Sequence, residues 1–321
     1  MENPKFNYQP KVLASSNDEI RYKGSSGGVI TQIIKYLFKT SQIKSAISFR
    51  FSGVELFEPN LIYSFEEYEH TGSVYHEINI YKFLKENINQ VQSPILITCL
   101  PCQVVPIKRL LDNNGIKNII VSLVCSNQLE KEATYYFLEK NNIDINKITD
   151  FRYRGNGWPS GIQIKTDEKE YFFHNNTSKW IDVFHSQIFN LNKCLSCKVT
   201  FGLSADLSIA DPWLKRYVEN DKVGSSIVIS HTKKAEELIS NMIENKVLDV
   251  IELLTKEEAI LSQKGTLQKK YILMKYKKFF KLLIKLFRTK TYKQYFFKVS
   301  KYHRWIWGKT MSILKKYEGL K

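Results

Sequence analysis

Residues 97–106 read "ITCLPCQVVP", an apolar run that leads directly into two cysteines three positions apart. The apolar run at 95–99 is typical of a buried strand, and residues 104–112 repeat apolar side chains at helical spacing. Pro101 suits the first turn of that helix, because its missing N–H would be unbonded there anyway. The stretch therefore predicts a strand, a tight turn carrying Cys102 and a helix, which is the repeating unit of α/β folds.

The same alternation of strand-like and helix-like segments extends through the first 264 residues. It favours an α/β fold with a mixed, partly parallel sheet and flanking helices, and residues 151–173 favour a hairpin or β-rich insertion. Strands are predicted at 46–51, 95–99, 119–125, 149–154, 161–165, 207–210 and 227–230. Helices are predicted at 29–39, 78–88, 104–112, 131–140, 178–189, 234–244 and 256–261.

Charge divides the chain into two parts. From Lys269 to Lys321 there are 17 Lys and Arg residues and one acidic residue, Glu318, which gives a net charge of +16. The preceding 268 residues hold 31 basic and 31 acidic residues and are neutral. A chain of 321 residues is long enough for one large or two medium domains. We therefore expect a neutral domain at 1–264 and a basic, amphipathic helical tail at 265–321.

Composition narrows the class of protein. A hydrophobic content of 43% and a charged content of 25% are typical of a globular protein. The start, "MENPKFNYQP", has no apolar core of a signal peptide, and no uncharged apolar stretch approaches the roughly 18 residues of a spanning helix. We therefore expect a cytoplasmic protein, in which an odd number of cysteines, five, argues for metal or redox chemistry rather than disulfides.

Four of the cysteines are placed to share one site. Cys102 lies at a predicted helix start, where the helix dipole favours a thiolate, and Cys125 ends the next predicted strand. If the two strands are parallel neighbours, both thiols emerge at the same carboxyl edge of the sheet. Cys194 and Cys197 form a C-x-x-C in a polar loop flanked by lysines, which is typical of a metal knuckle. Four such thiolates suit tetrahedral zinc or a 4Fe-4S cluster.

Spacing alone favours zinc, and it leaves other interpretations of the cysteines open. A zinc ribbon would pair Cys99 and Cys102 with Cys194 and Cys197, although a gap of about ninety residues is long for a ribbon. Cys99 and Cys102 would otherwise form the active pair of a thiol oxidoreductase, or both would be buried structural residues.

A serine- and glycine-rich segment, "RYKGSSGGVITQIIKYLF" at 21–38, offers a site for phosphate. Glycines let the backbone approach a ligand closely, and the free N–H groups of a helix start attract negative charge. The pattern is neither a P-loop nor G-x-G-x-x-G, and serine and glycine before a helix also form ordinary N-caps. The candidate contacts, with Arg21 as a further counter-charge, are Lys23, Ser25, Ser26, Gly27 and Gly28.

Two further segments combine charge with an aromatic ring. Arg154, Gly157 and Trp158 belong to a turn able to hold an anion beside a flat ring, or to a hairpin turn anchored by a buried tryptophan. Further along the chain, Asp206 and Asp211 lie at the ends of a predicted strand of alternating pattern. Their carboxylates would hydrogen-bond the hydroxyl groups or ring edge of a ligand, or cap the turn that follows.

The tail predicts contact with an anionic surface. Basic residues from Lys277 to Arg288 repeat at helical spacing among leucines and phenylalanines, and two tryptophans follow at 305 and 307. A basic helix with aromatic anchors suits the plane of an anionic membrane, at about 1 kcal/mol per basic residue. Helices packed on the body with solvated lysines are the structural alternative. Nucleic acid is the less expected partner, because the body is neutral.

The order of these motifs resembles the coenzyme F-420 hydrogenase/dehydrogenase beta-subunit family, specifically its C-terminal module in a bacterial type without the N-terminal ferredoxin-like region. The resemblance covers about residues 20–245, and no cysteine precedes Cys99. The matching motifs, in the family's order, are Ser25-Ser26-Gly27-Gly28, Gly72-Ser73-Val74-Tyr75, Pro101-Cys102-Gln103, Cys125, Gly157-Trp158, Cys194…Cys197 and Asp206…Asp211-Pro212-Trp213.

This resemblance implies an FAD- and 4Fe-4S-dependent oxidoreductase. Its cluster ligands would be Cys102, Cys125, Cys194 and Cys197, while Cys99 stands where the family usually has a small residue. The cluster would handle single electrons and the flavin would convert them into a two-electron step.

The flavin contacts implied by the family are residues 25–28 and the turn of Arg154 and Trp158. Without the ferredoxin-like region, electrons would come from a separate ferredoxin-like protein and pass to a small-molecule acceptor. The family also admits coenzyme F-420, but Val74 stands in place of the usual lysine, which speaks against that deazaflavin.

The role in the cell follows from the same resemblance. Shorter bacterial members are associated with polysaccharide biosynthesis, which implies a sugar-linked substrate for a cytoplasmic protein that is peripheral on the inner membrane face. The alternative is a zinc-stabilised, non-catalytic scaffold of a membrane-associated biosynthetic complex.

Overall fold

A computed structural model of the protein describes residues 4–175 and 177–320. Eleven strands among these residues form one large and one small sheet. The strands are β1 Lys11–Ser15, β2 Ser45–Phe51, β3 Phe57–Ile62, β4 Ile95–Cys99, β5 Asn118–Leu123, β6 Ile148–Arg152, β7 Gly161–Thr166, β8 Glu170–His174, β9 Leu207–Ala210, β10 Ser226–Ser230 and β11 Leu248–Leu253.

The large sheet has eight strands in the order β11-β1-β10-β9-β5-β4-β2-β3. Its centre is parallel, because β2 pairs with β4, β4 with β5 and β5 with β9 in the same direction. Its two ends are antiparallel. The mixed, partly parallel α/β fold expected from the sequence is therefore confirmed, and the carboxyl ends of β4, β5 and β9 meet at one edge.

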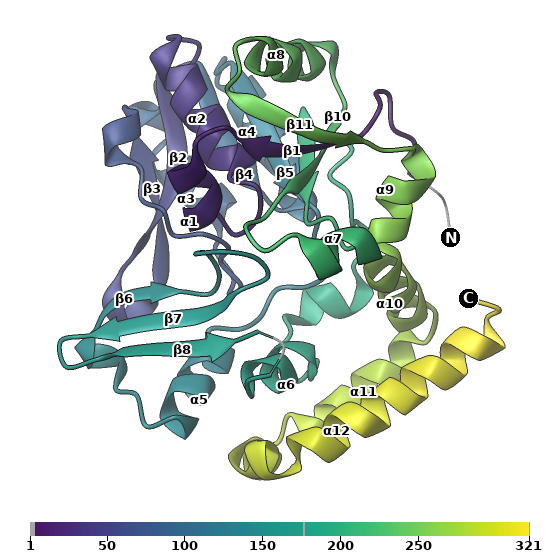
Figure 1. The fold of residues 1–321 in the computed structure, drawn as a ribbon. Coiled ribbons are helices and arrows are strands. Elements are labelled where there is room, and N and C mark those ends of the chain that lie inside the picture. The colour runs from purple at the N-terminus through teal and green to yellow at the C-terminus, as the bar shows by residue number, and fades with distance from the viewer. Residues whose placement is uncertain (1–3, 176, 321) are drawn as a thin grey trace.

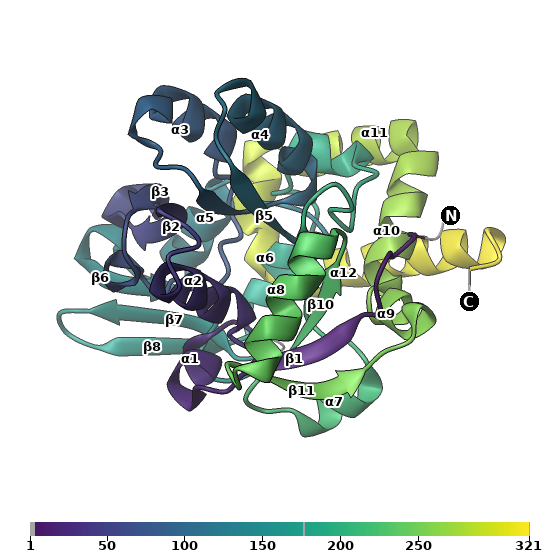
Figure 2. The ribbon, with the colours of Figure 1, turned by 90° about the horizontal axis from the view of Figure 1, so that it is seen from above.

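Helices cover both faces of the large sheet (Figures 1 and 2). α2 and α8 bury Ile33 and Ile239 against one face, and α3 and α4 bury Leu84 and Ile107 against the other. The helices are α1 Asp18–Lys23, α2 Val29–Lys39, α3 Ile80–Glu86, α4 Pro101–Asn113, α5 Glu132–Lys140, α6 Trp180–His185, α7 Lys215–Asn220, α8 Lys233–Glu244, α9 Lys256–Ser262, α10 Lys264–Lys275, α11 Lys277–Phe287 and α12 Lys290–Tyr317.

The small sheet is the β-rich insertion expected at 151–173. Its three antiparallel strands, β6-β7-β8, lie below the large sheet beside α5 in Figure 1. An aromatic cluster that includes Phe137, Tyr153 and Trp180 fills the space between this sheet, α5 and α6. The insertion thus forms a second wall facing the edge of the large sheet.

The last three helices, α10 to α12, pack against the rest of the protein. Leu195, in the short 3-10 helix Asn192–Ser196, packs with Ile272 of α10 and Phe280 of α11. Ser300 of α12 donates a 2.7 Å hydrogen bond to Asp182 of α6. Among the described residues, none of the helices combines the length and apolar character needed to cross a bilayer.

Some elements differ from those predicted. β1, β3 and β11 were not expected, and each lies at or near an end of the large sheet. β5 ends at Leu123, so that Cys125 lies in the loop beyond the strand. α4 begins at Pro101, three residues earlier than predicted, which places Cys102 inside its first turn.

Candidate functional site

A cavity of about 480 Å³ lies at the carboxyl edge of the parallel strands. Thr98 at the end of β4, Leu123 at the end of β5 and Ala210 at the end of β9 line it, and Ile181 of α6 contributes from the opposite side. Open α/β sheets bind ligands at this edge, because loops leaving parallel strands diverge there. The fold therefore creates a ligand-sized space where the sequence motifs converge.

The serine- and glycine-rich loop ends at the start of α2, in the cavity wall. Gly28 is the N-cap in the left-handed region (φ 69°), and no side chain caps the helix. Val29 and Thr31 of the first turn line the cavity together with Ser25 and Ser26. An uncapped helix start of this kind offers unpaired N–H groups to an anion.

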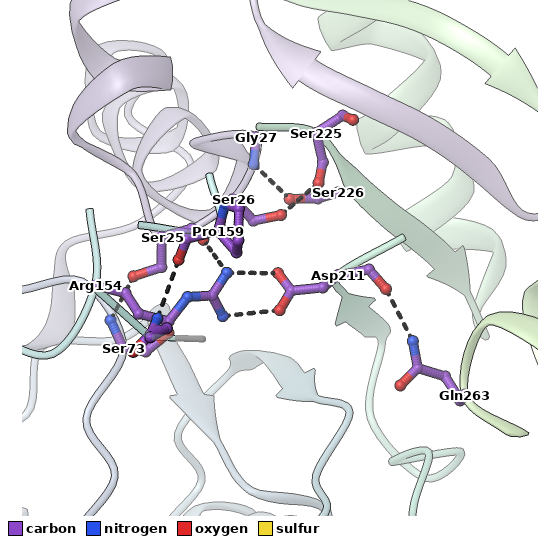
Figure 3. A network of polar contacts seen from close by, with 11 residues as sticks. Ser25, Ser26, Gly27, Ser73, Arg154, Pro159, Asp211, Ser225, Ser226 and Gln263 are labelled. Atoms are coloured by element: carbon purple, nitrogen blue, oxygen red, sulfur yellow. Dashed lines mark hydrogen bonds and ion pairs between the residues drawn. The ribbon is translucent and has the colours of Figure 1, made fainter. Parts of the chain in front are cut away.

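The loop is held rigidly from behind by β1 and β10 (Figure 3). The amide of Gly27 donates to Ser226 Oγ at 3.0 Å, and the Ser26 hydroxyl donates to the carbonyl of Ser225. The amide of Ser15 in β1 donates to the carbonyl of Gly27 at 2.7 Å. A Cβ added at Gly27 would lie 2.6 Å from the carbonyl oxygen of Leu13, so this position accommodates only glycine.

An ion pair crosses the cavity wall between the insertion and the large sheet. Arg154 Nη1 lies 2.7 Å from Asp211 Oδ2 and Nη2 lies 3.3 Å from Oδ1, and the same guanidinium donates to the carbonyl of Ser25 (Figure 3). Gln263 anchors the backbone of Asp211. Burial by itself would lower the pKa of Arg154, but the adjacent Asp211 carboxylate raises it above its usual value. The net shift is upward, and the pair stays charged.

Several buried polar atoms in the cavity wall have no hydrogen-bond partner within the described chain. Buried polar groups are almost always paired, so such atoms indicate a ligand. Burial lowers the pKa of His76 to about 4, and its Nδ1 faces the carbonyl of Glu77, which leaves Nε2 as an acceptor. The unpartnered cavity-lining atoms are Ser48 Oγ, His76 Nε2, Thr98 Oγ1, Gln128 Oε1 and Arg154 Nε.

Not all of the ligand contacts predicted from the sequence reach the cavity. Lys23, Ser25, Ser26, Gly28, Arg154 and Asp211 line it, and Gly27 lies directly behind. Lys23 also pairs with Glu19, and Arg21 turns away toward the carbonyl of Gly224. The lining also includes Trp213 and the segment from Gly72 to Tyr75, which the sequence motifs contained but did not single out as contacts, and His76, which no motif contained.

Asp206 and the turn at Gly157 and Trp158 lie outside the cavity lining. The Asp206 carboxylate accepts from the amide of Ile120 at 2.9 Å and from Thr232 Oγ1 at 3.0 Å, so it joins β5 to the cap of α8. Trp158 is buried, with its ring 5.1 Å from that of Trp213. The buried Trp158 agrees with the structural interpretation of its turn, whereas Asp206 precedes β9 and links β5 to α8 instead of capping the turn before Pro212.

A second, much smaller cavity of about 20 Å³ is lined by four cysteines. Cys102 comes from the first turn of α4, and Cys125 from the loop after β5. Cys194 and Cys197 come from the 3-10 helix and the residue after it. The amide of Gln128 donates to Cys194 Sγ at 3.4 Å. The four cysteines predicted to share a site thus face one cavity.

The four thiols line one cavity, but they are neither all deprotonated nor spaced as metal ligands. Burial raises the pKa of Cys125 to about 12, and burial together with the neighbouring thiols raises the pKa of Cys102 and Cys194. The thiolate expected at the start of α4 is therefore not favoured at Cys102. Within residues 4–175 and 177–320, no group of three or more His, Cys, Asp or Glu side chains is spaced to hold a metal ion as it stands.

Cys99 is separate from this group. It is buried in β4 and lines the large cavity instead of the small one. Burial raises the pKa of the Cys99 thiol to about 12, which suppresses the thiolate that a thiol oxidoreductase would need. The geometry therefore favours the set with Cys125 over the zinc-ribbon set with Cys99.

The two cavities share one wall, formed by the segment that follows β5. Cys125, Ser126, Asn127 and Gln128 line both cavities, together with Leu100. A group held by the four cysteines would therefore be separated from a ligand in the large cavity by a single layer of residues.

Helix α10 closes this region from the C-terminal side. Lys269 Nζ donates to Asn127 Oδ1 at 2.7 Å and also to Ser126 Oγ, and burial lowers the pKa of Lys269 to about 8. Lys270 Nζ lies 3.7 Å from Cys197 Sγ. Lys270 thus lines the cysteine cavity, and Lys269 holds the segment that separates it from the large cavity.

Two family models match the sequence, and both describe the beta subunit of coenzyme F420 hydrogenase/dehydrogenase. The model of its C terminus matches residues 93–256, and the model of its N-terminal part matches residues 12–85. The segment that the motifs assigned to one C-terminal module therefore spans both models. No curated protein matches the sequence.

The fold is similar to a chain of the F420-reducing [NiFe] hydrogenase complex from Methanosarcina barkeri. The TM-score is 0.62, the sequence identity is 16%, and the match covers 84% of this chain and 93% of that one. At this identity the likeness establishes a common fold.

Proposed function

The chain belongs to the coenzyme F420 hydrogenase/dehydrogenase beta-subunit family, and from this premise we propose that it is an iron–sulfur flavoprotein that passes electrons between a separate redox protein and a small-molecule acceptor. Membership of the family gives it an oxidoreductase role in electron transfer. The identity of the cofactors, the ligand residues and the acceptor are parts of the proposal.

Cys102, Cys125, Cys194 and Cys197 would hold a 4Fe-4S cluster. Four thiolates are the usual ligands of such a cluster, which exchanges single electrons. The donor set fits, because all four side chains line one small cavity that α10 covers on one side. Binding would require the four thiols to lose their protons and draw closer together.

The large cavity would hold FAD. A flavin exchanges one or two electrons, and the protein supplies orientation and electrostatics. The residues fit this group in two respects. The uncapped start of α2 and the Ser25 hydroxyl offer donors for a diphosphate, and the unpartnered atoms of Thr98, Gln128 and His76 offer hydrogen bonds to a flat polar ring.

The observation that carries the proposal is the wall shared by the two cavities. Cys125 belongs to both linings, so the loop after β5 separates the proposed cluster from the proposed flavin. Such closeness suits electron transfer between a one-electron and a two-electron carrier, because electrons would not have to cross solvent or a second domain.

The electron donor would be a separate ferredoxin-like protein. Support comes from the similar chain in Methanosarcina barkeri, which is part of a hydrogenase complex. The acceptor is proposed only as a small molecule. Val74 lines the cavity where the family usually has a lysine, and no arrangement among the described lining residues singles out a sugar or coenzyme F-420.

Anaerobic purification with analysis of iron, acid-labile sulfide, zinc and flavin tests this function. We expect four iron and four sulfide ions and one flavin per chain, as in any 4Fe-4S flavoprotein of this kind. A colourless protein with one zinc per chain would instead support the zinc-stabilised scaffold.

Matched cysteine variants locate the cluster. Cys125→Ser should lose the iron, whereas Cys99→Ala, at the buried end of β4, should keep it. Arg154→Met should lose flavin while retaining iron, since Arg154 lines only the large cavity. Full iron content in Cys125→Ser would refute the ligand set.

A further inference from the structure

Helix α12 carries a second apolar face that it does not use to pack on the body. Tyr295, Tyr302, Ile306, Ile313 and Tyr317 follow one another at steps of seven, four, seven and four residues. This spacing places them on one side of a helix, over a length of about 33 Å. Ile313 is 66% and Tyr317 is 81% exposed, so the stripe faces solvent.

Helix α11 presents a similar stripe. Phe279, Leu282 and Leu286 lie three and four residues apart, and both leucines are more than 60% exposed. Phe280 and Ile284, on a different side of the helix, are the residues buried against the body. The exposed apolar residues are therefore additional to those that fix the helix in the fold. Figure 1 shows that α11 and α12 lie at the periphery, remote from the large sheet.

Exposed lysines on both helices lack an acidic partner among the described residues. Four other basic residues of the tail are neutralised, because Lys275, Arg288, Lys293 and Arg304 pair with Glu318, Glu130, Glu132 and Asp182. Nine exposed lysines on the two helices form no ion pair with any residue of the described ranges. Six of these nine are Lys278, Lys281 and Lys285 on α11 and Lys298, Lys309 and Lys316 on α12.

We propose that this α11–α12 surface, the eight apolar residues and six lysines named above, binds an anionic lipid bilayer. The helices would lie in the plane of the interface, with the apolar stripes at the boundary of headgroups and acyl chains and the lysines against lipid phosphates. Exposed tyrosines and Trp305, which is 62% exposed, suit that depth because one end of each ring is polar.

A second copy of the chain is a poorer occupant of the same surface. A symmetric dimer would bring the same patch on both subunits together, and the unpaired lysines would then oppose lysines. A bilayer with anionic headgroups covers the apolar stripes and supplies the missing negative charge at once. The proposal does not depend on the redox function, because the surface lies outside both cavities.

Flotation of the full-length protein with vesicles tests the proposal. The protein should bind vesicles of equimolar phosphatidylglycerol and phosphatidylcholine, not vesicles of phosphatidylcholine alone, and added salt should weaken binding. Lys298→Gln, Lys309→Gln and Lys316→Gln together should weaken it about 100-fold, since each basic residue near an anionic surface contributes roughly fivefold.

A matched variant separates local from global charge. Lys39→Gln, Lys44→Gln and Lys108→Gln remove the same net charge from exposed positions on the body and should leave vesicle binding near the wild-type level. Equal loss in both triple variants would overturn the proposal, since binding would then reflect net charge alone.

The apolar stripe is tested separately. Ile306→Asp with Ile313→Asp should abolish binding while the circular dichroism spectrum stays that of the folded protein. If that variant does not fold, the tryptophan fluorescence of the wild-type protein tests the same point. Anionic vesicles should shift the emission maximum to shorter wavelength, and Trp305→Phe should remove this shift. Four outcomes would each refute a lipid-binding surface. They are wild-type binding by the double variant, no blue shift of the wild-type emission, no binding of the wild-type protein to vesicles, and a dimer that the same substitutions disrupt.

Discussion

His231 is a buried residue whose protonation should set part of the pH dependence of stability. It is 7% exposed, its Nε2 lies 2.7 Å from Ser208 Oγ, and burial lowers its pKa to about 4. In the unfolded chain its pKa is about 6.5, so between these values the unfolded state binds more protons. The free energy of unfolding should therefore fall as the pH decreases from 6.5 toward 4, by about 2 kcal/mol between pH 7 and pH 5.

Urea unfolding at pH 7 and pH 5 measures this contribution. His231→Gln should be destabilised at pH 7, yet lose less stability than wild type on going to pH 5. His174→Gln, at an exposed position on β8, is the control and should retain the wild-type slope. An unchanged slope in His231→Gln would mean that His231 is protonated in the folded protein at pH 5.

Two glycines should respond to alanine in opposite directions. Gly27→Ala would place a Cβ 2.6 Å from a carbonyl oxygen and 2.9 Å from the amide of Ser226, so we expect a loss of about 1–3 kcal/mol in unfolding free energy. Gly308 lies inside α12 with nothing within 4 Å of such a Cβ, and Gly308→Ala should add about 0.5–1 kcal/mol. The denaturant midpoint of each variant, compared with that of wild type, shows whether the substitution lowers or raises the free energy of unfolding.

At the same scale, residue patterns predicted the cavity better than they predicted its individual contacts. Ser25, Ser26 and Arg154, predicted as ligand contacts, line the cavity, because a glycine-rich helix start follows the loop at the sheet edge and the turn after β6 faces it. Trp158 and Asp206 were predicted as contacts because of their side-chain chemistry. In the structure the Trp158 ring packs against Trp213, and the Asp206 carboxylate links β5 to the start of α8. The sequence alone does not show whether a side chain in the cavity wall points into the cavity or away from it.

Among the helices, α10 should tune the proposed cluster. Lys270 Nζ lies 3.7 Å from Cys197 Sγ, and a positive charge beside a cluster favours its reduced form. Lys270→Gln should therefore make the reduction potential more negative, by roughly 50 mV for a nearby charge partly screened by solvent. Redox titration followed by electron paramagnetic resonance measures the shift.

Lys264→Gln is the matched control for this effect. It removes the same charge from the exposed first residue of the same helix and should leave the potential within a few millivolts of wild type. An unchanged potential in Lys270→Gln would show that the lysine only covers the cavity.

The elements predicted from sequence are those with a single strong pattern. β4 and α2 match their predicted bounds, because one is a continuous apolar run and the other has apolar residues at helical spacing. β3 was missed because Pro59 lies inside it, which is tolerated only because β3 is an edge strand. β11 was missed because its alternation is short and sits between two helices.

For the whole molecule, the charge break near residue 265 does not coincide with an end of packing. α10 reaches the cysteine cavity through Lys270, and α12 bonds to α6 through Ser300. Composition showed that the two parts differ in charge, but it could not show that they interlock, because long-range contacts leave no local pattern. The cysteine cavity and the α11–α12 surface are therefore joined through one short helix.

The position of β1 has a consequence for how the chain matures on the ribosome. β1 pairs only with β10 and β11, and the loop after it is held by Ser225 and Ser226. Residues 11–15 must therefore wait for their second neighbour until residue 253 has been made, roughly 10–50 s later at ordinary rates of synthesis. Until Ser225 and Ser226 have been made the glycine loop has no backing, so chains halted before β10 should not hold the proposed flavin.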